Sequence, residues 1–97
     1  MPGDRMPTYV YIVYYKLKEM TDEEEERARR EWEEMMAEWP PEVRLVGVYD
    51  HAWGTPYNGF LMLECDSMDA YAKFWRWFRD KVRWYVIETQ TVIATKR

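Results

Sequence analysis

The chain is poor in several residue types, and each scarcity limits what the protein can be. Its 97 residues include one cysteine, Cys65, so no disulfide can form within the chain, which fits a reducing compartment. No apolar run approaches the roughly 20 residues that span a bilayer. The chain does not begin with basic residues followed by an apolar run, so no secretory signal is predicted. We therefore expect a cytoplasmic protein with no membrane partner.

Basic side chains are also too few for general polyanion binding. Fourteen Lys and Arg stand against eighteen Asp and Glu, which leaves a formal charge of -4, whereas phosphate contacts need clustered Lys and Arg. The segment WRWFRDKVRW, residues 75–84, does interleave aromatic and basic residues, as some single-strand binders do. We interpret it as a solvated helix face with its aromatic residues turned inward, so no nucleic-acid partner is expected.

Histidine, asparagine and glutamine occur once each, as His51, Asn58 and Gln90. A single histidine with no second ligand nearby argues against a metal site, so we expect neither a metal nor a cofactor. Twelve Glu and nine Arg beside one Asn and one Gln form a balance that resembles that of heat-adapted proteins.

Aromatic residues, in contrast, are abundant. They make up 18% of the chain, with six Trp and eight Tyr. A single core in a domain of this size can hardly enclose all of them, because small domains bury a modest share of their surface. Some should therefore line a pocket or an interface with a partner, and self-association is expected.

Residue patterns predict six elements along the chain. Runs rich in β-branched and aromatic residues predict strands, and apolar residues at helical spacing predict helices. Residues 1–7 are expected to be a disordered leader, and residues 8–97 a single domain. The predicted elements are a strand at 8–17, a helix from 22 to the Pro40–Pro41 stop, strands at 43–50 and 57–65, a helix from about 67 to 80 or 82, and a strand at 84–95.

The order β-α-β-β-α-β predicts an α+β fold of the ferredoxin-like type, with a four-stranded antiparallel sheet and both helices on one face. Thr21 and Glu24 match a capping box at the first helix. Apolar residues occupy odd and even strand positions alike, so the uncovered sheet face is also apolar and should pack against a second sheet. On the last strand, alternation predicts that one face is shared by Val86, Glu88, Gln90, Val92 and Ala94.

The strand YVYIVYYKL, the unit PYNGFLMLECDSMDAYAKFWRWF and the long last strand resemble the dimeric α+β-barrel superfamily. The likeness is to its small uncharacterised bacterial and archaeal members and, more distantly, to antibiotic-biosynthesis-type monooxygenases. The resemblance implies a homodimer formed sheet to sheet and a cavity between sheet and helices. Heme-degrading members carry a Trp at the end of the third strand and a His on the next helix, where this chain has Cys65 and Phe74.

The segment YDHAWGTPYNGF, residues 49–60, is predicted to be the tip of the central hairpin and carries His51. An imidazole there could act as a proton acceptor at a cavity mouth, as a heme ligand, or as a surface residue. The candidate ligand-binding residues are aromatic and come from two strands, the hairpin tip and the second helix: Tyr11, Tyr49, Trp53, Tyr71 and Trp75. The alternative for these side chains is packing in the core.

The leading functional prediction is a homodimer, or a higher oligomer, that binds a small apolar or aromatic molecule between sheet and helices. The resemblance to the superfamily also implies a possible reaction, cofactor-free oxygenation or isomerisation, with His51 as the catalytic proton acceptor. Two alternatives stay open: a structural or assembly domain with no ligand, and heme binding through His51. The sequence does not decide whether the protein is an enzyme.

Overall fold

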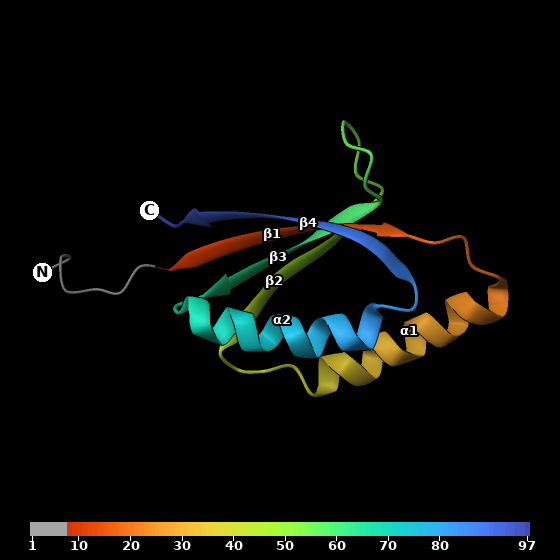
Figure 1. Ribbon diagram of the computed structural model, residues 1–97, viewed down its shortest axis with the longest axis horizontal. Coiled ribbons are helices and arrows are strands. Elements are labelled where there is room, and N and C mark those ends of the chain that lie inside the picture. Colours follow the sequence, from red (N-terminus) through yellow and green to blue (C-terminus); the bar gives the residue numbers. More distant parts are fainter. Residues whose placement is uncertain (1–7) are drawn as a thin grey trace, which may run out of the picture.

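The computed structural model describes residues 8–97, which form a four-stranded antiparallel sheet and two helices (Figure 1). The strands lie in the order β2-β3-β1-β4 across the sheet. This arrangement confirms the predicted ferredoxin-like fold; the prediction for residues 1–7 lies outside the described part of the chain. The elements are β1 (Tyr9–Leu17), α1 (Asp22–Ala37), β2 (Val43–Asp50), β3 (Gly59–Cys65), α2 (Met68–Val82) and β4 (Val86–Thr95).

Two strands begin later than the sequence predicts. β3 begins at Gly59, because the chain at Tyr57 is outside the sheet and the Tyr57 ring packs against Tyr14, with 5.8 Å between ring centroids. β4 begins at Val86, because the Tyr85 amide donates to the Val82 carbonyl at 3.1 Å and extends the turn after α2. Among residues 8–97, no helix is long and apolar enough to cross a membrane.

The helix starts follow the predicted capping chemistry. The Thr21 hydroxyl accepts from the Glu24 amide, and the Glu24 carboxylate accepts from the Thr21 amide, which completes the capping box. At α2 the Ser67 hydroxyl accepts from the Ala70 amide. Each cap satisfies amide groups that have no partner inside the helix, so both helices begin where a short hydroxyl side chain can accept from the amide three residues ahead.

Both helices cover the same face of the sheet, which we call the helix face (Figure 1). Tyr11 and Val13 of β1 lie there and are almost wholly buried. Trp39 joins the two helices, since its ring contacts Trp32 of α1 and Phe74 of α2. Its indole N–H is also satisfied, because it donates to the Val43 carbonyl at 2.8 Å. The core is therefore aromatic and lies on one side of the sheet.

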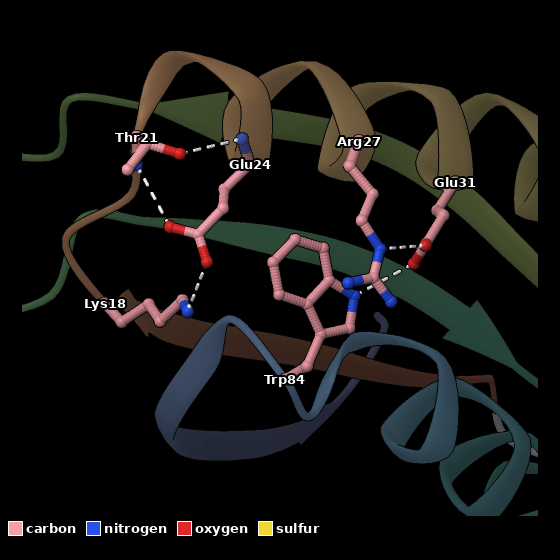
Figure 2. Close-up of polar contacts among 6 residues, drawn as sticks. All are labelled: Lys18, Thr21, Glu24, Arg27, Glu31 and Trp84. Carbon is pink, nitrogen blue, oxygen red and sulfur yellow. Dashed lines mark hydrogen bonds and ion pairs between the residues drawn. The ribbon is translucent and has the colours of Figure 1, made fainter.

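A polar network ties α1 to the turn before β4 (Figure 2). The Arg27 guanidinium lies over the Trp84 ring, 4.2 Å from its centroid, and Arg27 Nε donates to Glu31 at 2.8 Å. Trp84 Nε1 donates to the same carboxylate at 2.9 Å. These donors lower the pKa of Glu31, with the Arg27 hydrogen bond as the largest cause. The network holds the middle of α1 against the turn before β4.

The other side of the sheet, the open face, carries no helix (Figure 1). Its centre is apolar, and its ends are charged: Lys96 pairs with Glu64 at 3.3 Å. Strand pairing places fourteen residues there: Val10, Ile12, Tyr14, Lys16, Arg44, Gly47, Tyr49, Phe60, Met62, Glu64, Glu88, Gln90, Val92 and Ala94. An apolar sheet face of this kind is what the sequence predicted, and covering it would remove apolar surface from water.

Residues 51–58, which we call the arm, connect β2 to β3 and project on the side of the open face (Figure 1). The Ala52 amide donates to the Asn58 carbonyl at 3.0 Å and closes the base of the arm. The Tyr57 hydroxyl donates to Glu88 at 2.8 Å, across the open face. Positive φ angles at His51 and Gly54 let the chain reverse. The arm is therefore anchored to the open face at its base.

Candidate functional site

A cavity of about 410 Å³ lies between the helix face of the sheet and the helices α1 and α2. Alternation along β1 turns its odd-numbered residues toward the helices, and three of them, Val13, Tyr15 and Leu17, line the cavity. Ala28 and Trp32 form the α1 wall, and Phe78 forms part of the α2 wall. The cavity is thus mostly apolar, with a small number of polar groups.

One polar pair stands out in the cavity wall. The Tyr15 hydroxyl donates to Asp50 Oδ1 at 2.5 Å and lies 3.4 Å from the Tyr49 carbonyl oxygen. Burial raises the pKa of Tyr15 well above its usual range, and the hydrogen bond to Asp50 raises it further. Tyr15 therefore stays a neutral donor to the carboxylate at any physiological pH.

Gly59 makes room for the Tyr15–Asp50 contact. A Cβ atom at this position would lie 2.1 Å from the Tyr49 carbonyl oxygen and 2.6 Å from the Tyr15 hydroxyl, which no side chain could tolerate. Its neighbour Asn58 fixes the end of β1: the Asn58 amide donates to the Tyr15 carbonyl at 2.8 Å, and its side-chain oxygen accepts from the Leu17 amide at 2.7 Å. Asn58 and Gly59 together hold the pair in place.

A β-bulge in β2 decides which residues face the cavity. Leu45 pairs with Leu63 and Gly47 with Met62, so Val46 is an extra residue without a partner on β3. One extra residue makes every later side chain of β2 point to the opposite face from the one that plain alternation gives. Asp50 therefore lies on the helix face and Tyr49 on the open face. The Tyr49 ring then lies over Gly47, where a Cβ atom would come within 2.6 Å of its hydroxyl.

The structure brings three of the candidate aromatic residues together, away from the cavity wall. Tyr11 and Tyr71 stack with 3.7 Å between ring centroids, and Trp75 stacks on Tyr71 at 6.2 Å. Within residues 8–97, neither the Tyr11 nor the Tyr71 hydroxyl has a hydrogen-bond partner. Burial raises the pKa of both phenols. Their arrangement is that of a packed core, and the role of these residues in ligand binding stays a prediction.

The remaining candidates lie on or beside the open face. Tyr49 is 43% exposed and stacks on Phe60, with 4.9 Å between ring centroids. Trp53 is 93% exposed on the arm. Neither residue lines the cavity. Their position on the side of the open face separates them from Tyr11, Tyr71 and Trp75, which pack in the core on the helix face.

His51 follows Asp50 at the start of the arm and is exposed. Its φ angle of 57° is the left-handed region, which is uncommon for a residue other than glycine. The histidine does not line the cavity. In the part of the chain described, residues 8–97, no three His, Cys, Asp or Glu side chains gather into a metal-binding group. Its catalytic role stays a prediction.

Tyr15 and Asp50 are the cavity residues that sequence reasoning missed. Tyr15 could have been predicted from the sequence, because simple alternation places it on the same face of β1 as Tyr11 and Val13. Asp50 could not, since plain alternation along β2 places it with Arg44 on the opposite face. The signal for the change was Gly47, because glycine inside a strand often marks a bulge.

Comparison with known proteins supports the fold. No family model matches the chain, and no curated protein matches its sequence. Among solved structures, a DABB-family protein with a ferredoxin-like fold from Mesorhizobium loti is similar, with a TM-score of 0.68, 14% identity, and 94% of this chain and 98% of that chain covered.

Two further solved structures are similar in the same way. A dimeric ferredoxin-like protein of unknown function from Thermobifida fusca has a TM-score of 0.62 and 13% identity, with 95% of this chain and 93% of that chain covered. An uncharacterised NIPSNAP-like domain protein from Burkholderia xenovorans has a TM-score of 0.62 and 18% identity, with 96% and 88% covered. The class defined by these matches is the ferredoxin-like α+β domain, as the sequence predicted.

Proposed function

We propose that this protein is a homodimeric domain that binds a small apolar or aromatic molecule in the cavity between sheet and helices. The cavity carries the proposal: its volume of about 410 Å³ falls within the roughly 300–1,000 Å³ of known ligand pockets. Apolar walls with one well-placed polar pair, Tyr15 and Asp50, match the composition of such sites.

The homodimer rests on the open face. Its central residues Ile12, Phe60 and Met62 are only partly buried, and Val92 is 43% exposed. Pairing two such faces would bury apolar surface on both subunits, as in other isologous dimers. The similar protein from Thermobifida fusca is described as dimeric, which supports self-association here.

If the bound molecule is turned over, we expect Tyr15 and Asp50 to move the proton, because they line the cavity and share a hydrogen bond. His51 does not line it, so heme binding through His51 has no supporting contact. A carboxylate hydrogen-bonded to a neutral phenol can accept a proton from a ligand that reaches it. Binding is the function proposed; turnover would be a consequence of these two groups.

Binding is tested by fluorescence titration with N-phenyl-1-naphthylamine, an uncharged aromatic probe. We expect saturable binding that is lost in Ala28→Trp, since Ala28 is buried in the cavity wall and a large side chain would fill the space. Ala72→Trp, at an exposed position on α2, is the matched control and should bind normally. If the folded wild-type protein binds no probe, the binding proposal is contradicted and the alternative of a structural domain with no ligand is favoured.

The homodimer is tested by sedimentation velocity. Two 12.0-kDa chains should sediment together at micromolar concentration. A monomer under these conditions would contradict the sheet-to-sheet assembly, whatever the probe does.

A further inference from the structure

The polar end of the cavity offers hydrogen-bond acceptors and no free donor at the Tyr15–Asp50 pair. A tyrosine hydroxyl has one hydrogen, and Tyr15 gives it to Asp50 Oδ1. An ionised carboxylate only accepts, and within residues 8–97 the second oxygen of Asp50 has no hydrogen-bond or ion-pair partner. A ligand that reaches this pair must therefore bring the donor.

Charge around the cavity favours the same kind of ligand. Glu25 lines the wall near the start of α1 and adds a second carboxylate. Arg29 also lines the wall, but its guanidinium forms an ion pair with Glu26 on the same helix. The two wall carboxylates, Glu25 and Asp50, are both exposed, and they outnumber the one wall guanidinium, which is already paired. An anionic head group would meet repulsion here, whereas a cation would be attracted.

We propose that the cavity selects an apolar amine, with the aromatic or aliphatic body between α1 and the sheet and the ammonium hydrogen-bonded to Asp50. This inference rests on the proposed binding function and names its ligand class. The body would contact Val13, Trp32, Leu61 and Phe78, which line the same space. Tyr15 acts as a positioning residue, because its hydrogen bond holds the carboxylate at the cavity wall.

The test compares three molecules with the same aromatic body: 2-(1-naphthyl)ethylamine, 2-(1-naphthyl)ethanol and 1-naphthylacetate. Binding to the full chain is followed at pH 7 and low salt by amide chemical shifts, which also locate the site. We expect the amine to bind at least tenfold more tightly than the carboxylate, with the alcohol between them. Asp50→Asn should reduce the difference between amine and carboxylate to within about threefold, because it removes the charge and keeps the shape.

Asp80→Asn is the matched control, since Asp80 is exposed near the end of α2 and does not line the cavity; it should keep the full preference. The inference alone is overturned if the carboxylate binds as tightly as the amine, or if the preference survives in Asp50→Asn. If none of the three molecules shifts residues of the cavity wall, the proposed binding function itself fails. The comparison among ligands on the wild-type protein stands even if the Asp50 variant does not fold.

Discussion

The two faces of the sheet differ in how their aromatic residues are used. On the helix face, aromatic rings pack against one another beneath two helices, and Tyr11 and Phe74 are almost fully buried. On the open face, Phe60 contacts both Tyr14 and Tyr49, but neither helix of the described chain lies on this face. The two helices of residues 8–97 cover one face of the sheet, so the other face is the one left for the proposed partner subunit.

The faces also differ in their polar chemistry. The helix face holds the Tyr15–Asp50 hydrogen bond at the wall of a cavity, where Asp50 is also exposed to solvent. The open face keeps its charges at the ends, where Lys96 and Arg44 pair with Glu64. A polar pair at a cavity wall can select a ligand, whereas charges at the rim of an apolar patch are typical of an interface between proteins. One sheet thus supports both proposed roles.

The largest expected effect is a difference in how much each face of the sheet contributes to the free energy of unfolding. Phe74→Ala should lower the free energy of unfolding by about 3–5 kcal/mol, because Phe74 is 2% exposed in the core. Phe60→Ala, the same change on the open face, should cost much less in a monomer. Urea unfolding of both variants in the Ile12→Lys background, where the chain is expected to be monomeric, measures the difference, and equal losses would contradict the comparison.

A charge placed on the open face should break the dimer and leave the fold intact. Ile12→Lys puts an ammonium at the centre of the proposed interface, and burying it there costs several kcal/mol. We expect the dissociation constant to rise at least about 100-fold. Sedimentation velocity measures it, with Ala72→Lys on the exposed side of α2 as the control. An unchanged dimer would place the interface elsewhere.

Alkaline pH should lower the free energy of unfolding, because the buried Tyr85 on the helix face loses its proton. Burial raises the pKa of Tyr85 from 10.0 to about 12, and Glu31 adds to the shift. The unfolded chain therefore loses this proton first, so its contribution is complete below pH 10 and falls as pH rises toward 12. The loss is roughly 2–3 kcal/mol. Urea unfolding across this range should show a steeper fall in wild type than in Tyr85→Phe, and equal falls would refute this.

The smallest expected effect concerns the arm. Trp53→Ala should change the free energy of unfolding by less than about 0.5 kcal/mol, since Trp53 is 93% exposed. Thermal unfolding in the Ile12→Lys background, where the chain is expected to be monomeric, isolates this value from any effect on assembly. A loss above 1 kcal/mol would show that the Trp53 side chain packs against its own subunit.

Most of the fold was predictable because its determinants are local. The capping box at Thr21 and Glu24 and the proline stop after α1 depend on neighbours in sequence. The prediction that β1 is apolar on both faces needs only its composition, and simple alternation describes the two faces because that strand is regular where it pairs with β3. The late starts of β3 and β4 were missed because Tyr57 and Tyr85 make contacts beyond their own strands.

The candidate site was harder to predict, because two register shifts control it. On β4 the prediction that Val86 shares a face with Glu88 is wrong: Val86 pairs with Leu17 and Glu88 with Lys16, so Ile87 is the extra residue. Val86 consequently lines the cavity. On β2 the bulge at Val46 exchanges Tyr49 and Asp50 between the faces. Plain alternation cannot foresee either exchange.

The amino-acid sequence by itself determined the order of elements, the ends of the helices and a sheet that is apolar on both sides. These properties follow from local propensity and periodicity, which short stretches of chain carry alone. Tertiary structure decided that Asp50 meets Tyr15 at the cavity wall and that the arm stands on the open face. Both depend on the pairing of strands far apart in sequence, where one extra residue changes the direction of every side chain that follows.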